Sequence, residues 1–171
     1  MLSNLLPSAA IAALLASTLL VPAGNAQDSV PAVPPQPRWT LTASLEAVHA
    51  GADSWGFGPA LGIRHDFQSR WGVELRAALP AFGPNDSGAG AIDLAATYTS
   101  IEGSTELGAS LGATGFLVGD GSELTGGGVG LYVAAHATSR LTRGFGLTGG
   151  ANLRTAVGAF PAGYAGVALR F

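Results

Sequence analysis

The sequence contains no cysteine and no lysine, and only 11% of its 171 residues are charged. Without cysteine the chain has no disulfides, no thiolate metal ligands and no cysteine to carry a lipid. A soluble domain usually has about 25% charged residues, so this chain has too few to cover a surface that faces water. The net charge of −3 gives no basic character that would indicate a nucleic-acid partner.

Beyond its N-terminal region, the sequence also lacks a run of about 20 apolar residues, so no transmembrane helix is predicted there. Hydrophobic residues nevertheless make up 47% of the chain, and 26 residues are glycine. A membrane β-barrel combines these properties, because its hydrophobic residues alternate with others along each strand instead of forming a run.

The first 38 residues are predicted to precede the folded domain. Residues 9–21 are apolar and are followed by small residues up to Ala26, which predicts a secretory signal peptide over residues 1–26. Its first seven residues contain no Lys or Arg, and the alternative is an uncleaved N-terminal anchor. Residues 27–38 contain four prolines and are interpreted as an extended periplasmic lead-in.

From Trp39 onward, apolar and polar residues alternate with a period of two, which predicts β-strands. Short connections alternate with longer ones rich in Gly, Pro, Asp and Ser, the pattern of short periplasmic turns and longer outer loops. An even number of strands places both termini in the periplasm. The eight predicted strands are 39–49, 60–67, 71–79, 91–99, 106–117, 128–137, 145–154 and 164–171.

The last predicted strand alternates closely and the sequence ends on an aromatic residue. Ala165, Val167, Leu169 and Phe171 share one face, and Tyr164, Gly166, Ala168 and Arg170 share the other. This resembles the closing strand of outer-membrane β-barrels, which the barrel-assembly machinery reads. The resemblance implies an assembly signal formed by Tyr164, Val167, Leu169 and Phe171.

The two faces of the strands differ in chemistry. One carries mainly Leu, Ile and Val, and the other carries hydroxyl, charged and small residues. A soluble barrel would turn the aliphatic face inward and leave Gly and Ala to meet water, so we favour aliphatic residues toward lipid. Aromatic residues near strand ends indicate two girdles. The periplasmic girdle is predicted to contain Trp39, Phe67, Trp71, Tyr98, Phe145 and Phe171, and the outer one Trp55, Phe57, Phe82, Phe116, Phe160 and Tyr164.

Residues 39–171 therefore resemble the family of small eight-stranded outer-membrane β-barrels, which includes the transmembrane domain of outer-membrane protein A, outer-membrane protein X and opacity-type surface antigens. The resemblance implies an all-β, antiparallel up-and-down transmembrane barrel in the cell outer membrane. The implied function is non-enzymatic, structural or surface-exposed and adhesive. The implied partners are outer-membrane lipid, lipopolysaccharide and the barrel-assembly machinery, and the implied state is a monomer without cofactors.

Two alternatives are a small channel and, less favoured, a lipid A-modifying enzyme. Eight strands leave an interior just wide enough to be filled by side chains, which argues against a channel. Lipid A deacylases of similar size place a Ser two residues after a lipid-facing His. Here Gly51 follows His49 at that position, which argues against the enzyme. No catalytic or metal-binding residue is predicted.

The lumen is predicted to contain an ion network formed by Arg64, Glu74, Arg76 and Asp93. If Phe67 faces Trp71 across the turn at 68–70, then Arg64 lies directly opposite Glu74. A loop centred near residues 84–85 likewise places Arg76 opposite Asp93. Pairing is expected because an unpaired charge in a narrow lumen is costly, and the pairs would plug the barrel. Removal of Glu74 is then expected to destabilise the protein by roughly 3–5 kcal/mol if Arg64 and Arg76 are buried.

Overall fold

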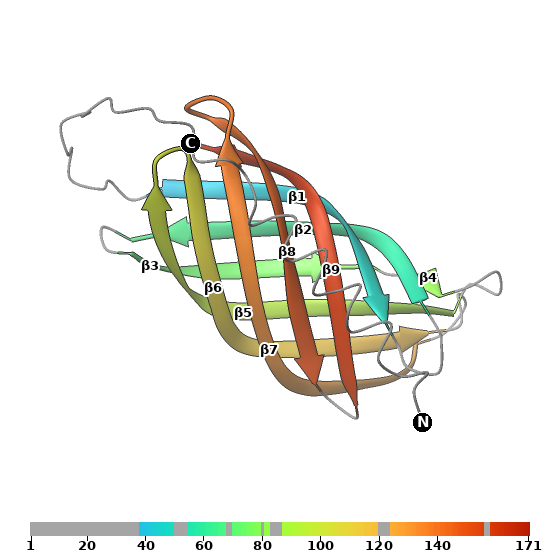
Figure 1. Cartoon of the computed structure of the whole chain (residues 1–171). Coiled ribbons are helices and arrows are strands. Elements are labelled where there is room, and N and C mark those ends of the chain that lie inside the picture. The colour runs from blue at the N-terminus through green and yellow to red at the C-terminus, as the bar shows by residue number, and fades with distance from the viewer. Residues whose placement is uncertain are drawn as a thin grey trace, which may run out of the picture.

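The computed structural model describes residues 38–49, 55–67, 70–79, 81–82, 87–119, 124–155 and 158–171. The predicted signal peptide, and the lead-in except for Arg38, lie outside these residues. The described chain is all β (Figure 1), and it contains no helix that is long and apolar enough to cross a membrane. Its strands are β1 (Arg38–His49), β2 (Trp55–Asp66), β3 (Trp71–Ala78), β4 (Ala81–Phe82), β5 (Ser87–Glu102), β6 (Thr105–Gly119), β7 (Leu124–Arg140), β8 (Phe145–Thr155) and β9 (Ala159–Arg170).

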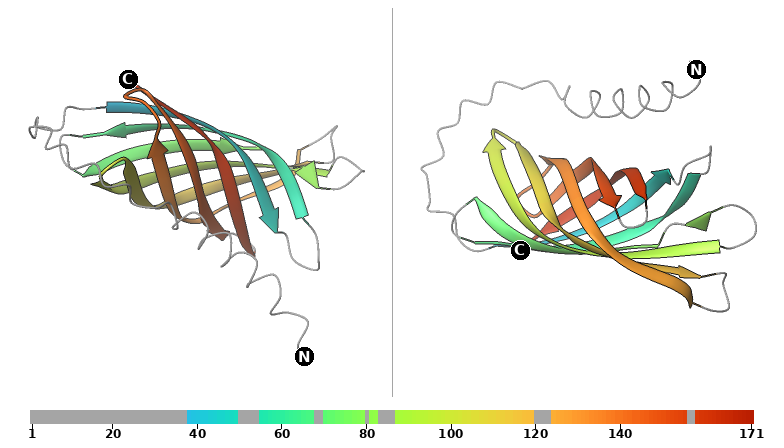
Figure 2. Two further views of the ribbon diagram at one scale, coloured as in Figure 1. Left: turned by 45° about the horizontal axis from the view of Figure 1, so that its top comes forward. Right: turned by 90° about the horizontal axis from the view of Figure 1, so that it is seen from below.

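The strands form one closed antiparallel sheet. Neighbours follow the order β1-β9-β8-β7-β6-β5-β3-β2, and β1 also pairs with β2, which closes the barrel. The short β4 pairs with β2 and β5, the same neighbours as β3, so β3 and β4 are two parts of one wall strand. The predicted eight-stranded up-and-down barrel is therefore confirmed. Figure 2 shows the strands curving together around the barrel.

The barrel has a turn end and a loop end. At the turn end, short connections join β2 to β3, β5 to β6 and β7 to β8, and the C-terminus lies beside the start of β1 (Figure 1). Backbone hydrogen bonds fix this closure, with Trp39 N donating to Phe171 O at 3.0 Å and Phe171 N donating to Trp39 O at 3.1 Å. Gly103, in the turn between β5 and β6, has a φ of 61°, which favours glycine.

The strands extend further toward the loop end than the sequence indicates. The prediction ended the fifth strand at residue 117 and began the sixth at 128, yet β6 continues to Gly119 and β7 begins at Leu124. Gly126 pairs with Val118 and Gly127 with Leu117, although these glycines suggested a loop. In a closed barrel, each strand has a hydrogen-bonding neighbour on both sides, and this outweighs the low strand propensity of glycine. The loops are correspondingly shorter than predicted.

Aliphatic side chains lie on the outside of the barrel and charged side chains lie within it. Leu45 and Leu94 are 62% and 61% exposed, whereas Arg76 and Asp93 are each 1% exposed. This is the reverse of a soluble protein, in which buried groups are mainly apolar. The outside of the barrel is apolar enough to contact lipid. The predicted orientation, with aliphatic residues outside and polar residues inside, is confirmed, and the arrangement of a soluble barrel is not observed.

Exposed aromatic residues gather at the turn end. Trp39, Phe67, Trp71, Tyr98 and Phe171 are exposed there, and Phe145 is half-buried. The Trp71 and Tyr98 rings lie 5.2 Å apart, and Trp39 lies 4.3 Å from the ring of His65. Arg70, in the turn outside the strands, donates a hydrogen bond to the Tyr98 hydroxyl at 3.2 Å, and this bond raises the pKa of Arg70.

The aromatic residues at the loop end divide between the two faces, which corrects the prediction of a complete outer girdle. Trp55 and Phe57 are exposed as expected. Phe116, however, packs inside against Ala60, Ala78 and Ala91, and its ring lies 5.2 Å from that of Phe160. Tyr164 is buried near the middle of β9, and the side chain of Phe82 lies outside the described part of the structure. Strand alternation, rather than position near a strand end, decides which way these rings point.

One glycine of β6 lies where the adjacent strand leaves no space for a side chain. A Cβ at Gly112 would lie 2.0 Å from Leu94 O and 2.5 Å from Ala95 Cα. We expect Gly112→Ala to destabilise the barrel by about 1–3 kcal/mol, because the backbone must shift. Urea unfolding in lipid vesicles measures this. Gly115 is the matched control, since its Cβ would be 3.9 Å from Ile92 O, and an equal cost at both positions would contradict the prediction.

Candidate functional site in the barrel interior

The candidate site is the set of charged side chains on the inner face. Because every second residue of a strand points inward, β1, β2, β3, β5, β6, β7, β8 and β9 each direct charges into the lumen. These charges form two groups. The loop-side cluster consists of Glu46, Arg76, Asp93 and Arg154, and the turn-side cluster consists of Arg64, Asp66, Glu106, Arg140 and Arg170.

The predicted register across β2, β3 and β5 is correct. Arg64 is paired in the sheet with Glu74, and Arg76 with Asp93. The backbone of Phe67 donates to Trp71 O at 2.9 Å across the turn, as the register requires. The predicted charge pairs nevertheless differ from those observed. Among the described residues, no ion pair joins Arg64 to Glu74 or Arg76 to Asp93.

In the loop-side cluster, one arginine joins two carboxylates. Arg154 Nη2 lies 2.7 Å from Asp93 Oδ2, and Arg154 Nε donates to Asp93 Oδ1 at 3.0 Å. Arg154 Nη1 also donates to Glu46 Oε1. Arg76 Nη2 donates to the other Glu46 oxygen at 2.8 Å. The cluster contains two arginines and two carboxylates, so its formal charges balance within the lumen.

Two tyrosine rings cover the arginines of this cluster. The guanidinium carbon of Arg76 lies 4.1 Å from the ring centroid of Tyr164, and that of Arg154 lies 5.6 Å from the centroid of Tyr132. These distances are within the range of cation–π attraction. Tyr164 was predicted to belong to the assembly signal and the outer girdle. The structure places its ring against a lumen charge, which corrects the girdle placement, whereas its part in the assembly signal stays a prediction.

In the turn-side cluster, one carboxylate accepts hydrogen bonds from three arginines. Glu106 Oε1 accepts from Arg64 Nη2, and Glu106 Oε2 accepts from Arg170 Nη2 and, at 3.4 Å, from Arg140 Nη2. Arg64 Nη2 also donates to Asp66 Oδ2 at 3.1 Å, and Arg64 Nη1 lies 2.9 Å from His136 Nε2. Because Arg64 has only N–H donors, Nε2 must be the acceptor. The imidazole is therefore held as a hydrogen-bond partner rather than free to act as a base.

Glu74 has a different position from the other inner carboxylates described. It is half-buried, and it accepts a hydrogen bond from Ser110 Oγ at 3.2 Å. It therefore contributes a polar contact to the wall between the clusters. This corrects the expectation that Glu74 is the carboxylate on which both Arg64 and Arg76 depend.

The predicted network left out six members of the two clusters, namely Glu46, Asp66, Glu106, Arg140, Arg154 and Arg170. The signal for four of them was present, because Glu46, Asp66, Glu106 and Arg170 fall on the inner face by alternation. Arg154 was assigned to a loop edge and Arg140 to a periplasmic turn, since the predicted strands ended before or at these residues. The prediction paired charges only on neighbouring strands, whereas in a narrow barrel long side chains reach across the lumen.

Among the described residues, no group of three or more His, Asp or Glu side chains is placed to hold a metal ion. His49, considered for lipid-modifying chemistry, is half-buried and lies against Trp55, with ring centroids 4.9 Å apart. The contacts between charged groups that the described interior shows are ion pairs.

No protein-family model and no curated protein matches the sequence. Solved structures do match the fold. The attachment invasion locus protein Ail of Yersinia pestis is 14% identical, with a TM-score of 0.58, and the match covers 80% of this chain and 99% of Ail. The outer membrane protein OprG of Pseudomonas aeruginosa is 12% identical, with a TM-score of 0.61 and coverage of 80% and 96%. Neisserial surface protein A is 16% identical, with a TM-score of 0.57 and coverage of 78% and 95%. The chain thus has the fold of the small eight-stranded outer-membrane β-barrels.

Proposed function

We propose that the protein is a non-enzymatic, structural barrel of the cell outer membrane whose lumen is closed by ion pairs. The observation that supports this most directly is the bridge that Arg154 makes between Glu46 and Asp93. These residues come from β8, β1 and β5, which are not neighbours in the sheet. Their contacts therefore cross the interior rather than run along one wall.

Burial of these charges supports a closed lumen. Glu46 is 0% exposed, and the guanidinium of Arg154 is held by two carboxylates. A permeating ion would have to displace paired charges from sites where little water replaces the lost contacts, and breaking a buried pair is costly. An eight-stranded barrel also has room inside for little more than its own side chains.

The exposed aliphatic belt and the fold support residence in the outer membrane. We place the turn end, with both termini of the barrel, in the periplasm, because short turns face the periplasm in barrels of this kind. Lipid and lipopolysaccharide would then contact the outside, and the barrel-assembly machinery would bind the last strand through Tyr164, Val167, Leu169 and Phe171. We propose a monomer. Leu169 and Phe171 are exposed, as such a signal requires.

An adhesive role is the second surface function to consider, because Ail is named as an attachment protein. The loop-end connections of this chain are short, since β6 ends at Gly119 and β7 begins at Leu124. A short loop presents little surface to a partner. The structural role is therefore favoured over adhesion.

A closed lumen predicts that the protein does not conduct ions across a membrane. We expect the purified protein, incorporated into planar lipid bilayers, to produce no single-channel steps above the lipid background. A gel shift between unheated and heated samples would show in parallel that the barrel is folded. Reproducible conductance steps from the folded protein would favour the small channel instead. Altered lipid A acylation in overexpressing cells, read by mass spectrometry, would favour the enzyme.

A further inference from the structure

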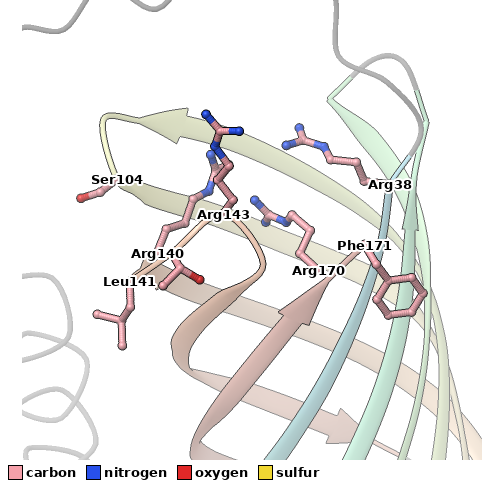
Figure 3. Close-up of a pocket in the computed structure, with 8 residues that line it drawn as sticks. Arg38, Ser104, Arg140, Leu141, Arg143, Arg170 and Phe171 are labelled. Atoms are coloured by element: carbon pink, nitrogen blue, oxygen red, sulfur yellow. The ribbon is translucent and has the colours of Figure 1, made fainter.

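A positively charged cavity lies at the turn end of the barrel. It has a volume of about 550 Å³, and its lining includes Arg38, Arg140, Arg143 and Arg170. These residues come from the start of β1, the end of β7, the turn before β8 and the end of β9. Figure 3 shows their side chains gathered at the rim of the barrel, around the same open space.

The acidic groups of the described chain do not neutralise this cavity. Glu106 lies beneath it, 2% exposed, and is shared by Arg64, Arg140 and Arg170. Among the described residues, no carboxylate is within ion-pair distance of Arg38 or Arg143. Phe171 also lines the cavity, and its terminal carboxylate accepts a hydrogen bond from Trp39 N. The single negative charge of this carboxylate is outnumbered by the four arginines of the lining. Positive charge is therefore left in excess at this mouth.

Hydrogen-bond donors are also left over. The Nε atoms of Arg38, Arg140 and Arg170 are buried and have no hydrogen-bond partner in the described structure. A buried donor without a partner is costly, and it is commonly satisfied by a bound ion or water. Ser104 and Thr142 add hydroxyl groups to the lining. The lining of the cavity thus combines excess positive charge with hydroxyl groups and with arginines whose Nε donors are unsatisfied among the described residues.

We propose that this cavity is a binding site for a phosphate-class anion with more than one charged group, such as a diphosphate or a phosphorylated headgroup. Guanidinium groups match phosphate oxygens in geometry and remain charged at all physiological pH values. The volume is typical of a small-molecule site and larger than one inorganic phosphate needs. This inference goes beyond the proposed structural role, and it holds whether or not the lumen conducts.

Arg143 and Arg70 form a matched pair for the test. Both are exposed arginines in turns at the same end of the barrel, but only Arg143 lines the cavity. The full protein in dodecyl maltoside is titrated with pyrophosphate, and binding is followed by ³¹P NMR. We expect saturable binding that Arg143→Gln weakens about tenfold, the effect of losing one charged hydrogen bond. Arg70→Gln should change the affinity less than about twofold, because Arg70 is outside the cavity.

Two results would overturn the proposal. One is the absence of saturable pyrophosphate binding to the native protein at millimolar concentration. The other is equal weakening by Arg143→Gln and Arg70→Gln, which would indicate general attraction to a positive surface. The heat-dependent gel shift verifies that each variant is folded, and Arg38→Gln provides a second variant at the opposite side of the cavity.

A second arm identifies the source of the phosphate group. The native protein is placed in phosphatidylcholine nanodiscs with and without phosphatidylglycerol, and the pyrophosphate titration is repeated. Phosphatidylglycerol is assigned to the cavity only if it weakens the affinity for pyrophosphate in the native protein and has no such effect in Arg143→Gln. This result would show that an anionic lipid headgroup competes for the cavity. An unchanged affinity would assign the site to a soluble phosphate compound.

Discussion

Replacing Glu46 by glutamine is expected to destabilise the barrel by about 3–5 kcal/mol, although the two side chains have nearly the same shape. Glu46 is fully buried and is the acidic partner of both Arg76 and Arg154. Its neutralisation leaves two buried arginines with Asp93 as the remaining carboxylate of the loop-side cluster. The free energy of unfolding in urea, followed by tryptophan fluorescence in lipid vesicles, measures the effect.

Glu74→Gln is the matched control for this substitution. Glu74 also points into the lumen, but it accepts a hydrogen bond from Ser110 and forms no ion pair among the described residues. We expect a cost of about 1 kcal/mol, the usual value for one hydrogen bond. If Glu74→Gln instead cost as much as Glu46→Gln, pairing between neighbouring strands would describe the lumen better than pairing across it.

The second large effect is expected on the outside of the barrel. Leu75 is 48% exposed on β3 and is paired with Ile63 and Leu94 of the adjacent strands, within the aliphatic belt. An arginine there would lie near the middle of the bilayer, and Leu75→Arg should cost about 2–4 kcal/mol. The same vesicle unfolding assay measures it.

Ile101→Arg tests whether depth in the membrane causes that cost. Ile101 is also exposed, but it lies near the end of β5, beyond the girdle residue Tyr98. An arginine near the interface should cost only about 0–1 kcal/mol. Equal costs at Leu75 and Ile101 would mean that the belt does not lie in lipid at the depth inferred here.

Much of the fold could be predicted from the sequence because alternation and turn composition are local signals. The register of β2 against β3 followed from one turn, and the pairing of Arg64 with Glu74 in the sheet confirmed it. Strand ends were harder to predict. The glycines at 126–128 have no strand preference of their own, and they are held in β7 by the ladder to β6, a long-range effect.

The contacts of the interior could be predicted only in part. Alternation places Glu46 and Arg170 inside, but it does not say which charges meet, because that depends on the diameter of the closed barrel. Arginine side chains are long enough to pass over small residues on neighbouring strands. Tyr164 shows the same limit, since its position in the sequence suggested the rim whereas its inward direction brings it against Arg76.

The crossing contacts of the loop-side cluster have a consequence for how the chain folds. Glu46 and Arg154 are 108 residues apart in sequence. Arg154 belongs to the last hairpin and forms an ion pair with Asp93 as well as with Glu46. Until that hairpin inserts, an unfinished sheet presents Glu46 with Arg76 alone and leaves Asp93 without its arginine. Partly assembled sheets are thereby penalised relative to the complete barrel. Closure should therefore be a cooperative, all-or-none step, with few stable intermediates in the membrane.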